Sequence, residues 1–262
     1  MPLSLPMDDQ QVKQLAAQIN ANGFARLRDV ISQPDLQQLR GFTDAHAQLH
    51  HGEYFAYHGE KALSQSLLGN IWSDPGFKRL VNDLYREAAH QEAPSDRIFP
   101  VLRCVQGNVG QKESNCFHFD ASLVTALVPI FIPGEGTERG DLMVFPNLRK
   151  VRTSVLLNVI EKALVQNRLT RKLMTLAIDR GWLKPQTIPL VPGDIYLFWG
   201  YRSLHANKAC GAGIKRATAI FHFGDPHAGS LATRLILQFN QRRARRLSDK
   251  TGTPPSESTL GQ

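Results

Sequence analysis

The chain has 262 residues, of which 42% are hydrophobic and 21% charged, and its formal net charge is +8. This length fits one large domain or two small ones, and the apolar content is sufficient for a full-sized core. No apolar run approaches the ~20 residues of a membrane span, and the first residues lack the charged-then-apolar pattern of a signal peptide, so we expect a cytoplasmic protein.

The cysteines favour the same compartment. There are three of them, Cys104, Cys116 and Cys210, and they are widely spaced and form no C-x-x-C pair. This usage is typical of a reducing cytoplasm and indicates neither a disulfide framework nor a zinc knuckle.

The positive charge is concentrated in two segments. Residues 150–184 carry eight Lys or Arg against two acidic residues, residues 234–250 carry six against one, and the remainder sums to −3. Such segments suit an anionic substrate, a phosphate-rich partner or a membrane surface, or they are simply the solvated faces of helices.

The first 97 residues are predicted to form a helical support for the rest. Helices are predicted at about 8–22, from 32 onward and at 74–90, with a short strand at 24–27. Asp8 and Ser32 are suitable N-caps for the first two helices. Aromatic residues at 51–75 can line a substrate lid or pack in the core, and we favour packing.

From residue 98 the pattern changes to strands. They are predicted at 98–106, 117–132, 142–146, 195–199 and 216–223. Pro192 and Gly193 are suited to the middle of a type II turn that precedes the fourth strand. Short strands with Gly/Pro turns and no alternating helices predict a mainly β, α+β domain with an antiparallel sandwich or barrel at 98–226.

One helical segment, 152–183, interrupts these strands. Its leucine-rich stripes predict one broken helix or a pair, with apolar faces packed inward and basic residues outward. A basic helix containing R-R-A-R-R is predicted at 227–247, followed by a disordered tail at 248–262. We therefore treat 1–247 as a single domain.

The candidate chemistry begins at S-N-C-F-H-F-D, residues 114–120. On a strand, side chains two apart share a face, so His118 and Asp120 would lie side by side. One imidazole and one carboxylate make two thirds of the two-His-one-carboxylate site that holds Fe(II) and leaves coordination positions open. The best second histidine is His205, which closely follows the 195–199 strand.

A candidate anion clamp lies eleven residues beyond His205. Arg216 and Thr218 fall on the last predicted strand and share a face. A guanidinium with a neighbouring hydroxyl is well suited to hold a planar carboxylate. Each pattern is weak alone, but their order along the chain and the strands that carry them favour a joint functional interpretation.

With these residues in this order, the chain resembles the Fe(II)/2-oxoglutarate-dependent dioxygenases, which have a double-stranded β-helix (jelly-roll) core. In style it is closest to the phytanoyl-CoA hydroxylase-like group, and its early N-G-F-A-R-L-R-D-V-I-S-Q-P-D-L-Q-Q-L-R is similar to the opening of those enzymes. The core resemblance covers about 98–226. The chain departs from that group at F-P-N-L-R-K, where a P-G-S-H-like segment is common.

The resemblance implies roles for the candidate residues. It assigns iron binding to His118, Asp120 and His205. It assigns the distal carboxylate of 2-oxoglutarate to Arg216, with Thr218 assisting.

A further polar contact to 2-oxoglutarate would come from an early strand, where Arg103 and Gln106 are the candidates. The implied reaction consumes O2 and 2-oxoglutarate, releases succinate and CO2, and hydroxylates an unactivated C–H of a small, anionic metabolite, lipid or sugar-type substrate. Halogenation is disfavoured because Asp120 supplies a carboxylate where halogenases of this type have a small residue.

Two other classes of function remain open. The first is a nucleic-acid-binding or nucleic-acid-modifying protein that uses R-R-A-R-R to grip phosphates, although no basic strand interleaved with aromatic residues supports it. The second is a non-catalytic jelly-roll that binds a metal or ligand structurally.

Overall fold

The computed structural model describes residues 3, 5, 8–107, 114–134, 139–151, 154–211 and 213–228. The elements in chain order are α1 (Asp9–Asn22), β1 (Ala25–Leu27), α2 (Gln33–Leu49), β2 (Phe55–His58), the short 3₁₀ helix η1 (Lys61–Leu63), α3 (Leu68–Ser73), α4 (Pro75–Ala89), β3 (Ile98–Val105), β4 (Val124–Phe131), β5 (Leu142–Phe145), α6 (Val155–Gln166), α7 (Arg168–Asp179), β6 (Gln186–Ile188), β7 (Ile195–Phe198), β8 (Leu204–Asn207) and β9 (Arg216–Phe223).

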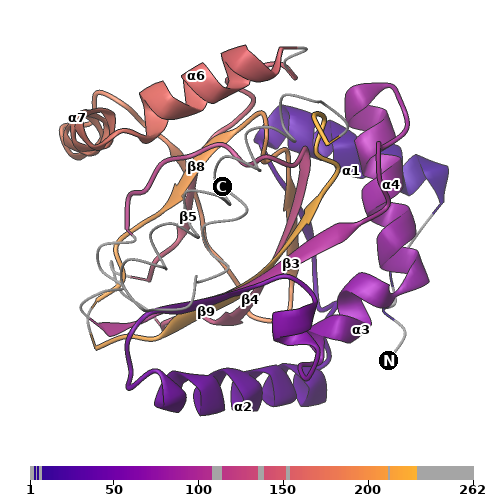
Figure 1. Ribbon diagram of the computed structural model, residues 1–262, viewed down its shortest axis with the longest axis vertical. Helices are drawn as coiled ribbons and strands as arrows, with labels where there is room; N and C mark the ends of the chain where they lie inside the picture. Colours follow the sequence, from indigo (N-terminus) through magenta and orange to yellow (C-terminus); the bar gives the residue numbers. More distant parts are fainter. Residues whose placement is uncertain are drawn as a thin grey trace, which may run out of the picture.

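These strands form two antiparallel sheets. Six strands make one sheet in the order β1-β7-β4-β9-β3-β2, and three make the other in the order β6-β5-β8. The two sheets face one another, and helices flank them (Figure 1). The predicted fold class is confirmed: this is an α+β protein with a double-stranded β-helix core.

The N-terminal helices begin where capping side chains allow. Asp8 accepts a hydrogen bond from the Gln11 N–H at 2.7 Å and completes a capping box for α1. Ser32 caps α2, and Asp74 caps α4 through the Phe77 N–H at 2.9 Å. The three predicted N-terminal helices are therefore confirmed.

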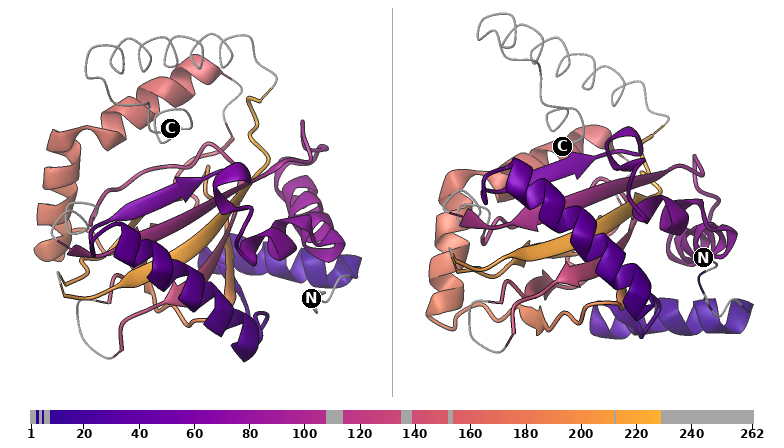
Figure 2. Two further views of the ribbon diagram at one scale, coloured as in Figure 1. Left: turned by 60° about the horizontal axis from the view of Figure 1, so that its bottom comes forward. Right: turned by 90° about the horizontal axis from the view of Figure 1, so that it is seen from below.

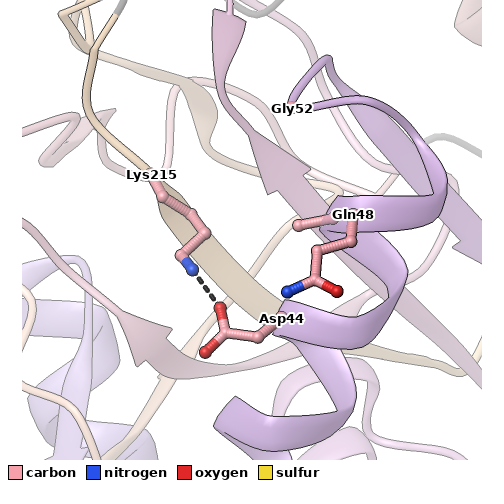
Figure 3. A pocket seen from close by; sticks show the side chains of 5 residues that line it. Asp44, Gln48, Gly52 and Lys215 are labelled. Atoms are coloured by element: carbon pink, nitrogen blue, oxygen red, sulfur yellow. Dashed lines mark hydrogen bonds and ion pairs between the residues drawn. The ribbon is translucent and has the colours of Figure 1, made fainter.

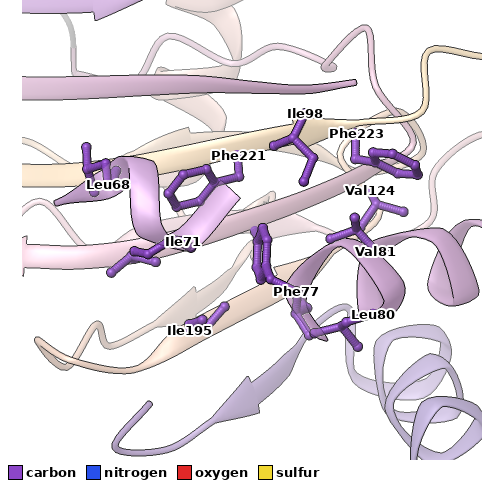
Figure 4. Packing of buried hydrophobic residues seen from close by; sticks show 14 of the residues in the cluster. Leu68, Ile71, Phe77, Leu80, Val81, Ile98, Val124, Ile195, Phe221 and Phe223 are labelled. Carbon is purple, nitrogen blue, oxygen red and sulfur yellow. The ribbon is translucent and has the colours of Figure 1, made fainter. Parts of the chain in front are cut away.

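Helices α1 to α4 cover the outer face of the six-stranded sheet, and α2 lies across its strands in Figure 2. The main hydrophobic core fills the space between them. Figure 4 shows Phe77 of α4 close to Phe221 of β9, and their ring centroids are 5.4 Å apart in an edge-on contact. Since side chains alternate along a strand, the neighbours of Phe221 point to the interior between the two sheets.

The aromatic segment after α2 packs as predicted. Phe55 is buried in the main core and Tyr57 packs against it, so most of this segment is structural. Tyr54 is different, because the Arg103 guanidinium lies 5.7 Å from its ring centroid. β2, η1 and α3 within this segment were not predicted.

Part of the interior between the sheets is filled by apolar side chains. This inner cluster contains Leu127, Leu142, Val144, Ile188, Leu190, Tyr196 and Phe198. It borders the inner-face polar residues, because Val144 pairs with His205 across β5 and β8 and the ring centroids of Phe198 and His205 are 5.0 Å apart.

The helical insertion is a pair of helices, α6 and α7, broken at Asn167. Figure 1 places them on the side of β5 and β8, away from α2. The predicted orientation of their apolar faces is wrong, because several leucines of both helices are exposed. Periodicity identifies an apolar stripe but not which of two stripes another element covers.

The remaining predictions concern the C-terminal segments, the cysteines and membrane-spanning helices. The basic helix at 227–247, apart from His227 and Ala228, and the tail at 248–262 lie outside the described residues. All three cysteines are free. Among the described helices, none is both long and apolar enough to cross a bilayer.

Candidate metal centre

Two chain segments bring the candidate ligands together. His118 and His205 form an isolated antiparallel bridge, in which each backbone N–H donates to the other residue's carbonyl at 3.0 Å. The Asp120 N–H donates to the Gly200 carbonyl at 3.0 Å, in the turn between β7 and β8. The single strand predicted at 117–132 is wrong, because β4 begins only at Val124; the bridge to β8 positions His118 instead.

The side chains of these three residues converge on one point. Asp120 Oδ1 lies 3.6 Å from His118 Nε2 and 3.5 Å from His205 Nε2. One donor atom from each residue lies within 4.8 Å of the others. Two imidazoles and one carboxylate at this spacing can hold one divalent ion on one face and leave its opposite face open.

Both imidazoles are held in the tautomer that a metal requires. His118 Nδ1 lies 2.8 Å from the Cys116 carbonyl oxygen, and His205 Nδ1 lies 3.0 Å from the Ser203 carbonyl oxygen. Because a carbonyl can only accept, Nδ1 carries the proton in each ring and the Nε2 lone pair faces the other ligands.

The Asp120 carboxylate is fixed through its second oxygen. Thr125 on β4 donates its hydroxyl to Asp120 Oδ2 at 2.6 Å, and His222 Nδ1 lies 3.7 Å from the same oxygen. A Cβ added at Gly200 would collide with Asp120 Oδ2 and Thr125 Oγ1, so a larger residue there would displace these side chains. Thr125, Gly200 and His222 were not predicted as site residues; only the alternation of β4 places Thr125 on the inner face.

Burial and charge set the protonation of the ligands. Burial, with a contribution from the His205 imidazole, lowers the pKa of His118 to about 3. Burial also acts to lower the pKa of His205, but the Asp120 carboxylate raises it above its ordinary value. Burial acts to raise the pKa of Asp120, yet His205 and His222 hold it well below its usual range. Any proton at the ligand cluster therefore resides on His205.

Arg216 lies beside this cluster at the start of β9. It is 1% exposed, and its Nη2 donates to Asn207 Oδ1 at 2.9 Å. Asn207 is two residues from His205 on β8, so both side chains share the inner face about 7 Å apart along the strand. A Cβ at Gly140 would collide with Arg216 Cδ, so the chain passes close over the guanidinium.

The donors of Arg216 and Thr218 fit an anionic group in the interior. Arg216 Nε and Nη1 and Thr218 Oγ1 are buried without a hydrogen-bond partner among the described residues. Burial, reinforced by the charge of Arg103, lowers the pKa of Arg216 to about 10, so the guanidinium remains protonated at neutral pH. Buried donors in this state normally have an acceptor, and a carboxylate supplies two.

The two candidates for an additional contact lie in different environments. Arg103 pairs with Thr218 across β3 and β9, so its side chain shares the inner face, and its charge acts on both histidines. Gln106 lies beyond the end of β3 and donates its side-chain amide to the Glu53 carbonyl at 3.0 Å. Arg103 is thus the better placed of the two.

A separate pocket on the outer surface is lined by Asp44, Ala47, Gln48, Gly52 and Lys215 (Figure 3). Lys215 forms an ion pair with Asp44 across it. Since α2 covers the outer face of the sheet, this pocket lies on the opposite side from the ligand cluster, and its opposite charges are already paired.

Comparison with known proteins identifies the fold but no sequence relative. No protein-family model matches the sequence, and no curated protein sequence matches it. HygX from Streptomyces hygroscopicus, with nickel and 2-oxoglutarate bound, matches with a TM-score of 0.55 at 14% identity, over 81% of this chain and 86% of that one.

Two further solved structures match at similar levels. A prolyl 4-hydroxylase from Phytophthora capsici has a TM-score of 0.54 at 12% identity, over 87% of this chain and 69% of that one. The epimerase SnoN of nogalamycin biosynthesis, in complex with Fe3+, alpha ketoglutarate and nogalamycin RO, has a TM-score of 0.53 at 17% identity, over 83% and 85%. At these identities the likeness establishes the shared fold.

Proposed function

We propose that this protein is an Fe(II)- and 2-oxoglutarate-dependent oxygenase. The observation that carries the proposal is a juxtaposition on the inner face of the barrel. Three convergent ligands, His118, Asp120 and His205, lie next to a buried arginine whose remaining donors have no acceptor among the described residues. Structures of the same fold that hold 2-oxoglutarate with nickel or Fe3+ support it.

The chain's own residues perform the holding and orienting. His118, Asp120 and His205 would bind the iron, with Thr125 and two backbone carbonyls fixing their directions. Iron bound there would supply O2 activation coupled to oxidative decarboxylation of 2-oxoglutarate to succinate and CO2, with oxidation of a substrate C–H.

Arg216 and Thr218 would hold the distal carboxylate of 2-oxoglutarate. The guanidinium offers a charged, two-pronged donor set, and its burial strengthens each hydrogen bond by excluding water. Arg103, on the same inner face, is our candidate for the further contact, whereas Gln106 already donates to Glu53.

For the reaction outcome we propose hydroxylation of an unactivated C–H in a small, anionic substrate. The positive charge of residues 150–184, eight Lys or Arg against two acidic residues, supports an anionic substrate. Membership in the phytanoyl-CoA hydroxylase-like group stays a prediction. The structural neighbours include an epimerase and a carbocyclase, so different outcomes occur on this fold.

An anaerobic titration with 2-oxoglutarate tests the proposal. Fe(II)-loaded wild type should develop the metal-to-ligand charge-transfer absorption of chelated 2-oxoglutarate. Arg216→Ala should need at least roughly tenfold more 2-oxoglutarate, because a charged hydrogen bond in a buried site is lost. Arg180→Ala, which removes the exposed arginine that follows α7, is the matched control and should titrate like wild type.

The ligand assignment has its own test. His118→Ala and Asp120→Ala should abolish 2-oxoglutarate turnover in air. Full turnover in either variant, with iron still bound, would refute that assignment. If iron-bound, folded wild type shows no absorption band at all, the protein is a double-stranded β-helix that uses its site for something other than 2-oxoglutarate.

A further inference from the structure

Helix α7 presents large apolar side chains to solvent. Leu169, Leu173 and Leu176 follow one another at helical spacing and are 67%, 57% and 41% exposed. The opposite side of the helix already has its contacts, because Met174 and Ile178 pack against the three-stranded sheet. The exposed row is therefore a second apolar face that the described fold leaves uncovered.

Cationic and aromatic side chains border this row. Lys172 is exposed within it, and Arg180 follows at the end of the helix. The Arg180 guanidinium lies 5.1 Å from the ring centroid of Trp182, which is itself 70% exposed. We call Leu169, Lys172, Leu173, Leu176, Arg180 and Trp182 the α7 face.

The preceding helix extends the apolar surface and is firmly attached. Leu157, Ile160 and Leu164 on α6 are also exposed. Glu161 on the same helix accepts a hydrogen bond from the buried Arg149 guanidinium at 3.1 Å, and Arg149 also donates to the Tyr201 carbonyl. The helical pair is thus held to the barrel through a buried charge.

We propose that the α7 face binds the surface of a lipid bilayer that contains anionic lipid. A helix with leucines on one face, lysine and arginine beside them and a tryptophan at its end has the chemistry of an interfacial helix. The leucines would enter the acyl boundary, Trp182 would lie at headgroup level, and Lys172 and Arg180 would pair with lipid phosphates. This proposal concerns attachment and does not depend on the reaction.

Charge distinguishes a bilayer from the other possible occupants. A symmetric contact with a second copy would place Lys172 and Arg180 against the same cations of that copy. The chain's own 234–250 segment is also strongly basic, and Asp179 is the one acidic residue of α7. A nucleic acid would match the cations but would leave the leucines without an apolar partner.

Vesicle co-sedimentation of the full-length protein tests the proposal. Wild type should sediment with phosphatidylcholine vesicles that contain about a third phosphatidylserine, and far less with pure phosphatidylcholine. The Lys172→Gln/Arg180→Gln variant should bind roughly 25-fold more weakly, since each basic residue near an anionic surface is worth about fivefold. Leu169→Asn/Leu173→Asn should lose binding to both vesicle types.

Leu49→Asn is the matched control, because Leu49 is equally exposed but lies at the end of α2 on the opposite side of the molecule. It should bind like wild type, and all variants should retain the wild-type unfolding temperature to within a few degrees. No sedimentation of wild type with anionic vesicles would overturn the proposal. So would Leu169→Asn/Leu173→Asn binding vesicles normally while converting a dimer to a monomer in light scattering.

Discussion

At the scale of single residues, Asp120 uses its two carboxylate oxygens for different purposes. Oδ1 faces the two Nε2 atoms, whereas Oδ2 accepts the Thr125 hydroxyl at 2.6 Å. When one oxygen of a carboxylate is held, the direction of the other oxygen is fixed. The side chain has then already lost its conformational entropy before a metal binds. Thr125 is therefore a positioning residue for the candidate metal centre.

We expect Thr125→Val to weaken Fe(II) binding by roughly tenfold or more, because this change keeps the side-chain shape and removes only the hydroxyl that orients Asp120. The affinity can be measured by anaerobic competition with a chromogenic chelator. Thr187→Val on β6, where the side chain is exposed, is the control. Equal affinities of Thr125→Val and wild type would show that the turn at Gly200 orients Asp120 without help.

The protonation of His205 predicts the pH dependence of metal binding. Its pKa is raised above the ordinary 6.5 by Asp120, whereas the pKa of His118 is near 3. Below the raised pKa, metal must displace one proton from His205, so affinity should fall about tenfold per pH unit as pH drops. Above the raised pKa of His205, the metal affinity should not change with pH. His118 should contribute nothing to the pH dependence.

Calorimetric or chelator-competition titrations with Mn(II), from about pH 5.5 to about pH 8.5, measure this dependence directly. One proton should be released per ion at the acidic end and none at the alkaline end. A slope of two protons at the acidic end would contradict the picture, since it would require both histidines to be protonated in the metal-free protein.

At the scale of elements, the turn between β7 and β8 shapes the site by what it lacks. Gly200 has no side chain, and a Cβ there would collide with the Asp120 carboxylate and the Thr125 hydroxyl. We expect Gly200→Ala to push Asp120 out of line, reducing Fe(II) affinity more than tenfold while the protein still folds. Gly213→Ala, whose Cβ would meet nothing within 4 Å, should be silent in the same binding assay.

The same scale shows why some features could be predicted and others could not. Caps such as Asp8 and Ser32 act within one turn of helix, so their effect is local and readable from the sequence. The candidate ligand triplet could be proposed from the H-x-D spacing and the chain order, although His118 and Asp120 precede β4 and the strand assumed for them is absent. Gly200 matters only through contacts made across the fold, and nothing local distinguishes it from any other turn glycine.

The exposed leucines of α7 illustrate a different limit. Their spacing predicts a helix, and α7 exists over Arg168–Asp179. However, Leu173 on one side and Met174 on the other are both apolar, and the barrel contacts only the second. Which side is covered depends on how the chain enters and leaves the helix, and the apolar pattern alone does not contain that information.

At the scale of the whole molecule, the site joins two sheets that otherwise meet through an apolar cluster. His205 and Asn207 belong to the three-stranded sheet, whereas Arg216 and Thr218 belong to the six-stranded one. A metal and a dicarboxylate bound between them would act as bridges between the two sheets. Ligand binding should therefore raise the free energy of global unfolding and not only order the site locally.

We expect 2-oxoglutarate at about 100 times its Kd to stabilise the Mn(II)-loaded protein by about 2.7 kcal/mol. For a domain of this size that corresponds to a rise in unfolding temperature of roughly 5–10 °C. Differential scanning fluorimetry with and without Mn(II) measures this rise.

In metal-free protein the rise should be small, because only the Arg216 end of the co-substrate would be held. At the same 2-oxoglutarate concentration, Arg216→Ala should keep the rise caused by Mn(II) alone and lose about half or more of the increment from 2-oxoglutarate, as expected for an affinity at least roughly tenfold weaker. An equal increment in wild type and Arg216→Ala would mean that 2-oxoglutarate is held elsewhere. A full increment in metal-free protein would mean that 2-oxoglutarate binds independently of a metal held by the three ligands.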